Sequence, residues 1–326
     1  EVHADAKNHG IVMYLDWSGS MCGIIKDTVE QLLVLVEFCR KVNIPFEVYA
    51  FSSNMYHPYD GSYCDEANEF IKSQSDQWVK SRETDVEPHD FQLYNFLSSR
   101  MNKRQYQTAV RNLWDLTAAV DYYHGRRHPS CLGLGSTPLN EAVLCAMQQV
   151  PEFQRKNDIQ IVNTVFLTDG EGHGLGMGPS YYEKNRAFVR DEKTRRTYEI
   201  KSRGFGSNET QALLEMLRDQ TGSNLVGIRL HDAKNIKHLR WSGGWETDEE
   251  FETASKQYAN QNFTTMDSAY NEYFIVKGDL KVEFDPLQNL DDDASFTRIK
   301  NAFVKGGSRK KSSRVIANRM VEIFAA

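Results

Sequence analysis

The stretch IVMYLDWSGS, residues 11–20, is the most informative part of this sequence. Its first five residues are apolar and predict a buried strand, and Asp16 follows at the carboxyl end of that strand. Ser18 and Ser20 come next at alternate positions, before a helical pattern begins. Hard divalent cations such as Mg2+ take oxygen ligands, and one carboxylate with two hydroxyls fills part of that shell without neutralising the ion. The segment therefore predicts a cation site that still attracts an acidic group from a partner.

Strand and helix patterns alternate along the chain, which indicates an α/β fold with a doubly wound, mostly parallel sheet. The run IQIVNTVFL, residues 159–167, is almost continuously apolar, as expected for a central strand that is buried on both faces. The other predicted strands of the core are 46–51 and 224–230, and the predicted helices are 23–42, 139–150 and 208–220.

We predict a single domain over residues 1–326, with two interruptions. The first is a mainly helical insertion, 52–131, in which Asn102 and Gln105 form the capping-box pattern of a helix start. The second is an irregular insertion, 232–271, and a helical extension is predicted at the C-terminal end, 291–326.

Two further segments are expected to lie beside Asp16. LGLGSTPLNE, residues 132–141, has Thr137 directly before a helix, and LTDG, residues 167–170, has Asp169 at the end of a buried strand. In an open α/β sheet, ligands bind at the carboxyl ends of the strands, near the point where the strand order reverses. Each motif alone has an ordinary explanation as a helix cap or a turn. Their joint occurrence, each beside a matching apolar element, favours one shared site.

The sequences LDWSGSM, LGSTPLNEAV and FLTDGEGHG resemble the loops of a von Willebrand factor A-type (VWA) domain with a metal-ion-dependent adhesion site. Together with the helical insertion, they are similar to the VWA subunit of cobaltochelatase, especially its shorter bacteriophage relatives. The resemblance implies a Rossmann-like VWA sheet and a bound Mg2+, Mn2+ or other divalent cation with one open coordination position. It also implies the ligands: hydroxyls of Ser18, Ser20 and Thr137 directly, and carboxylates of Asp16 and Asp169 directly or through water.

In that family, the VWA subunit works beside a ring-forming AAA+ ATPase of the MoxR type, and an acidic residue of a protein partner meets the metal. The resemblance therefore implies a metal-dependent protein-interaction module, acting as adaptor to such an ATPase in a chelatase-like or remodelling complex. Two alternatives stay open: a structural virion or assembly component of a phage, and a cobaltochelatase subunit.

Composition and motifs argue against several other classes. The net charge of −6 does not favour nucleic acid as a partner, and no apolar run is long enough for a membrane span. Because neither a G-x-S-x-G elbow nor an H-E-x-x-H helix is present, we expect no catalytic activity of the chain alone. The five cysteines are scattered, which favours a reducing compartment. We therefore expect a cytoplasmic protein, located in the host cytoplasm or the virion if a phage encodes it.

The sequence leaves the functions of two further segments open. Glu171 and His173 follow Asp169 and could adjust the choice of partner, or form a solvated rim of the site. The basic segment 305–314 could meet phosphate or an acidic partner, or could be a solvated linker between helices.

Overall fold

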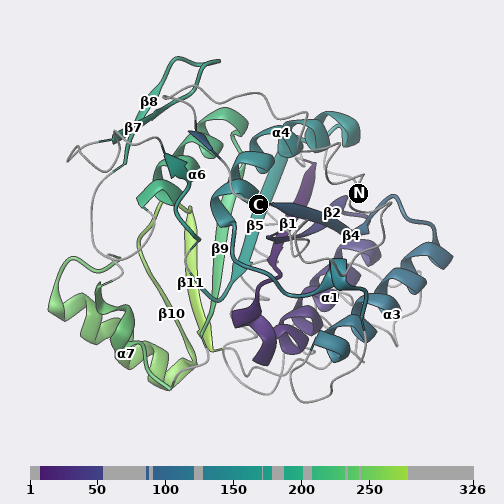
Figure 1. Cartoon of the computed structure of the whole chain (residues 1–326), viewed down its shortest axis with the longest axis horizontal. Coiled ribbons are helices and arrows are strands. Elements are labelled where there is room, and N and C mark those ends of the chain that lie inside the picture. The colour runs from purple at the N-terminus through teal and green to yellow at the C-terminus, as the bar shows by residue number, and fades with distance from the viewer. Residues whose placement is uncertain are drawn as a thin grey trace, which may run out of the picture.

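A central sheet with helices on both faces forms the described part of the chain (Figure 1). The computed structural model describes residues 8–53, 86–87, 91–120, 128–170, 172–177, 187–200, 208–231, 234–241 and 244–277. Glu171, the basic segment 305–314 and the predicted extension 291–326 lie outside these residues. Within the described residues, no helix combines the length and the apolar character that a membrane span requires.

The central sheet has seven strands in the order β10-β11-β9-β5-β1-β2-β4. The strands from β11 to β2 run parallel, whereas β10 and β4 pair antiparallel at the two edges. The bounds are β1 His9–Asp16, β2 Phe46–Ser52, β4 Gln92–Ser98, β5 Ile161–Thr168, β9 Asn224–His231, β10 Phe263–Thr265 and β11 Glu272–Lys277. Because β2 lies on one side of β1 while β5 lies on the other, the strand order reverses at β1. The predicted α/β class with a mostly parallel sheet is confirmed.

Helices from different parts of the chain cover the two faces of the sheet. Residues of α1 (Ile25–Lys41) and α3 (Lys103–Val120) pack in one apolar cluster, and residues of α4 (Leu139–Asn157) and α6 (Asn208–Thr221) pack in a second. A smaller third cluster contains residues of α7 (Asp248–Gln261), which Figure 1 shows at the end of the sheet near β10 and β11. The remaining elements are β3 Val86–Glu87, β6 Gly176–Met177, β7 Ala187–Arg190, β8 Thr197–Ile200 and the 3-10 helices η1 Gly19–Gly23, η2 Ser130–Leu132 and η3 Lys237–Trp241.

An aromatic row crosses the sheet on the face covered by α4 and α6. Tyr14 stacks on Tyr49 and on Phe166, at ring-centroid distances of 5.6 and 4.9 Å. Tyr270 contacts Phe166 at 6.0 Å and stacks on Tyr273 at 5.1 Å. Because these rings come from β2, β1, β5, β11 and the segment just before β11, they join strands that are distant in sequence on this face of the sheet.

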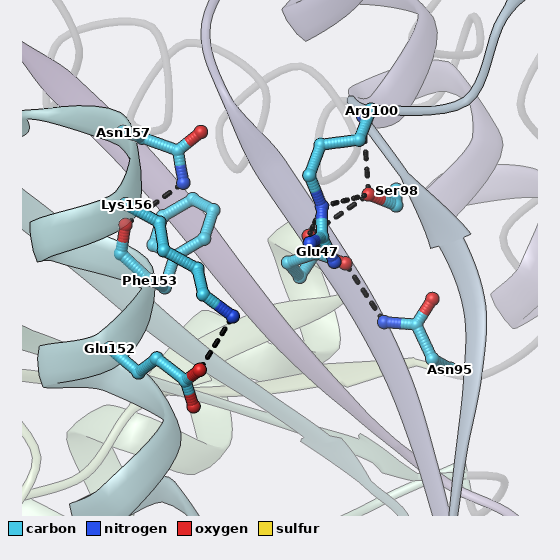
Figure 2. A network of polar contacts seen from close by, with 8 residues as sticks. All are labelled: Glu47, Asn95, Ser98, Arg100, Glu152, Phe153, Lys156 and Asn157. Atoms are coloured by element: carbon cyan, nitrogen blue, oxygen red, sulfur yellow. Dashed lines mark hydrogen bonds and ion pairs between the residues drawn. The ribbon is translucent and has the colours of Figure 1, made fainter.

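The edge strand β4 is attached to β2 by a polar network around Glu47 (Figure 2). The Glu47 carboxylate is almost fully buried and accepts hydrogen bonds from Asn95 Nδ2 at 2.8 Å and Ser98 Oγ at 2.9 Å. Arg100 adds an ion pair of 3.0 Å. Since Glu47 lies at the amino end of β2, this network lies away from the carboxyl ends of the parallel strands.

The two predicted insertions contain more regular structure than the sequence suggested. The first does contain a helix, α3, and the reciprocal bonds between Asn102 and Gln105 confirm the predicted capping box. It also contains β4, a strand of the main sheet that the prediction of a mainly helical insertion missed. The second contains the 14-residue helix α7, whose capping box joins Thr247 and Glu250. Few side chains of this polar helix are buried, so its sequence shows only a weak apolar periodicity and did not predict a helix.

Candidate metal site

Asp16 ends β1 with its carboxylate fully buried between strand ends. The neighbouring parallel strand β5 ends at Thr168, whose hydroxyl donates to Asp16 Oδ2 at 2.7 Å, although the two residues are 152 positions apart. Thr168 Oγ1 also accepts the Gly170 N–H at 3.1 Å. This threonine therefore fixes both the Asp16 carboxylate and the first turn of the loop that carries Asp169.

The two serines after β1 form a directed path to Asp169. Ser20 Oγ donates to Asp169 Oδ1 at 2.9 Å, and the Ser18 and Ser20 hydroxyl oxygens lie 3.0 Å apart. A serine hydroxyl has one proton, so Ser18 is the donor in its contact with Ser20. Ser18 is buried, Ser20 is exposed and Asp169 is half-buried, so these contacts connect the interior with the surface at Ser20.

The segment that carries Thr137 is attached to the same loop through its backbone. Ser18 and Gly135 form an isolated parallel bridge, and the Gly19 N–H donates to the Gly135 carbonyl at 2.8 Å. A Cβ on Gly135 would lie 2.5 Å from Ser53 Oγ, so only glycine fits this close approach. Thr137, two residues further, is buried and precedes Pro138, the N-cap of α4, and its carbonyl accepts the His173 N–H at 3.2 Å.

The structure thus connects some of the predicted residues by direct side-chain hydrogen bonds and others only indirectly. Hydrogen bonds join Ser18, Ser20 and Asp169 directly, and Asp16 joins them through Thr168 and the loop that follows it. Thr137 is tied to the group by backbone contacts of its own segment. His173 is exposed, and its backbone N–H donates to the Thr137 carbonyl.

Burial makes negative charge unfavourable at this site when no cation is present. Burial raises the pKa of Asp16 from 3.8 to about 7, with a smaller contribution from the nearby Asp169 charge and against the lowering effect of the hydrogen bond from Thr168. Burial also raises the pKa of Asp169, against the lowering effects of the Ser20 hydrogen bond and the Arg229 charge. A cation beside both carboxylates would favour their ionised forms.

The donor set fits a hard divalent cation. Asp16 Oδ1 is buried and has no hydrogen-bond partner among the residues that the structure describes, so one carboxylate oxygen is available for another contact. Around it are hydroxyl and carboxylate oxygens, the ligand types that Mg2+ and Mn2+ prefer. In the described ranges, no cluster of three or more His, Cys, Asp and Glu side chains could hold a metal.

Sequence reasoning missed two residues of the site, Thr168 and Asn140. Thr168 was visible as the threonine of LTDG, but its partner Asp16 is distant in sequence. Asn140 lies in the first turn of α4 and is fully buried, and its amide joins two other segments. Its position in STPLNE carries no local signal of that role.

Comparison with known proteins gives no family for this chain. No family model matches it, and no curated protein is similar to it in sequence. Among solved structures, the pilus adhesin SpaC from Lactobacillus rhamnosus GG is 11% identical at a TM-score of 0.43, over 99% of this chain and 31% of SpaC. The PilB minor pilin from Streptococcus sanguinis is 10% identical at a TM-score of 0.41, over 99% of this chain and 64% of that chain.

The human COPII-coat protein Sec24c is 10% identical at a TM-score of 0.31, over 70% of this chain and 27% of its own. This chain spans less than a third of SpaC and less than two thirds of the PilB chain. Likeness at this level assigns neither a family nor a function.

Proposed function

We propose that this chain is a VWA-type domain and that its metal-ion-dependent adhesion site makes it a protein-interaction module. One observation carries the proposal: the hydrogen-bonded path from Ser18 through Ser20 to Asp169 lies beside the buried Asp16, where β1 and β5 end. This is the switch point of the sheet, where ligands bind in open α/β folds.

The residues of the site have distinct tasks in this proposal. Ser18, Ser20 and Thr137 would hold the ion through hydroxyl oxygens, and Asp16 would face it with the carboxylate oxygen that Thr168 leaves unused. A bound Mg2+ or Mn2+ would supply a concentrated positive charge and an open coordination position suited to an acidic side chain of a partner. Because Ser20 is exposed and Asp169 is half-buried, a partner would approach from their side of the site.

We propose further that the partner is a MoxR-type AAA+ ATPase and that the chain serves as its adaptor. The support for this step is the resemblance of the three loop motifs and the helical insertion to the VWA subunit of cobaltochelatase. In the adaptor, the metal site would bind an acidic residue of the partner, and ATP-driven motion of the ring would act on a third component.

A pull-down with a cognate MoxR-type ATPase tests the proposal. Recovery is expected in Mg2+, and loss is expected in EDTA and with Asp16→Ala. Ser136→Ala is the matched control, because Ser136 is an exposed serine of the neighbouring loop and is not in the predicted ligand set. Equal recovery with and without EDTA would remove the metal from the interaction.

A further inference from the structure

The amide of Asn140 joins three segments near the candidate metal site. Its side chain is fully buried, Nδ2 donates to the His173 carbonyl at 2.8 Å, and Oδ1 accepts from Thr210 Oγ1 at 2.6 Å. Thr210 lies in the first turn of α6. One buried amide therefore links the start of α4, the loop after β5 and the start of α6.

The His173 backbone is held at both of its polar groups by one short segment. Its N–H donates to the carbonyl of Thr137, and its carbonyl accepts from Asn140, three residues further along. The loop also packs tightly, since a Cβ on Gly172 would lie 2.7 Å from Leu139 Cβ. The separation between the Thr137 segment and the loop that begins at Asp169 is thus fixed.

The same loop is attached to α6 at a second point. The Leu175 N–H donates to Glu209 Oε2 at 3.3 Å, and Glu209 is buried next to Thr210. A shift of the loop after Asp169 would therefore strain the first turn of α6, and the reverse also holds.

We propose that Asn140 is a positioning residue of the metal site, and that it couples occupancy of the site to the stability of the first turns of α6. The inference rests on the proposed function, because it concerns the ion that the site would hold. Mg2+ requires near-ideal octahedral geometry, so a small displacement of the Thr137 segment relative to Asp169 weakens binding. Replacing a residue that orients metal ligands through hydrogen bonds typically weakens metal affinity by about 10–100-fold.

The first test measures Mn2+ affinity of the full chain by electron paramagnetic resonance. Asn140→Ala is expected to weaken binding about 10–100-fold. Asn163→Ala is the matched control, since Asn163 is also fully buried but lies near the amino end of β5. If both variants lost thermal stability but kept the Mn2+ affinity of the wild type, Asn140 would have a structural role only. That result would overturn the proposal.

The second test separates the two hydrogen bonds of Asn140 by amide hydrogen exchange with and without Mg2+. In the wild type, Mg2+ is expected to slow exchange at His173 and in the first turns of α6. Thr210→Val leaves the bond to His173 in place, so protection should persist at His173 and fall in α6. If Mg2+ still slowed amide exchange in α6 in both Thr210→Val and Asn140→Ala, the proposed coupling between the metal site and α6 would be overturned.

Failure of the proposed function would appear differently from failure of this inference. Absence of Mn2+ binding by the wild type contradicts the metal site itself. Wild-type binding that Asn140→Ala leaves unchanged contradicts only the role of Asn140.

Discussion

The Ser20 hydroxyl donates to the Asp169 carboxylate at 2.9 Å, across 149 positions of the sequence. This bond closes the loop after β1 onto the loop after β5 at the point where the strand order reverses. Because Ser20 in turn accepts from the buried Ser18, the polar side chains of the two loops form one hydrogen-bonded group.

The first prediction concerns Ser20. Ser20→Ala removes both a proposed hydroxyl ligand and the bond to Asp169, so Mn2+ affinity is expected to fall by about tenfold or more. Isothermal titration measures the change, and Ser136→Ala should bind like the wild type. Equal affinities of the two variants would exclude Ser20 from the site.

The second prediction concerns the pH dependence of stability in the metal-free protein. The pKa of Asp16 is raised from 3.8 to about 7, so between these values the folded chain binds a proton that the unfolded chain has released. The contribution of protonated Asp16 is therefore complete below pH 3.8 and is lost as the pH rises to about 7.

Urea unfolding in EDTA at a series of pH values measures this loss. The free energy of unfolding should fall from pH 4 to 7 more steeply in the wild type than in Asp16→Asn. Added Mn2+ should reduce the fall, because a cation stabilises the ionised carboxylate. Identical slopes for the two proteins would contradict the raised pKa.

The third prediction concerns the edge strand β4. Glu47→Ala leaves the donors of Asn95 and Ser98 without their acceptor and should destabilise the fold by about 1–3 kcal/mol. Arg100→Ala should cost less, at most about 1 kcal/mol, because the Arg100 side chain is 62% exposed and water screens its ion pair. Chemical denaturation compares the two. A larger loss for Arg100→Ala would show that the ion pair, rather than the buried hydrogen bonds, holds β4.

The fourth prediction uses two glycines of the loop after β5. A Cβ on Gly172 would meet Leu139 Cβ at 2.7 Å, whereas a Cβ on Gly170 would have no atom within 4 Å. Gly172→Ala should therefore displace the loop and lower both Mn2+ affinity and melting temperature, while Gly170→Ala should leave melting temperature nearly unchanged. The opposite order would mean that the loop is not packed against the start of α4.

The sequence was sufficient for elements whose signal is local. The continuous apolar run of β5 and the capping box of Asn102 and Gln105 each depend on neighbouring residues, and both predictions agree with the structure. The edge strand β4 was missed because most of it is only half-buried, which leaves no clear alternation of apolar and polar residues. The helix α7 was missed for a similar reason, although Thr247 and Glu250 did offer a capping-box signal.

The residues of the candidate site also differ in how far the local sequence reveals them. Asp16 and Asp169 could be found because each directly follows an apolar strand or lies at its end, and parallel strands bring such ends together. The roles of Thr168 and Asn140 depend on contacts between segments that are far apart in sequence. Thr168 bonds Asp16, which is 152 positions away, and Asn140 bonds His173, which is 33 positions away. No local pattern encodes such pairings.

Mn2+ titration of the wild type and of Asp16→Asn measures whether oxygen atoms of these loops bind a divalent cation. Asp16→Asn preserves the shape of the side chain and a carbonyl acceptor for Thr168, but removes the charge. We expect saturable binding to the wild type and at least about a tenfold weaker affinity in the variant. Absence of binding to the wild type, or equal binding to both proteins, would contradict it.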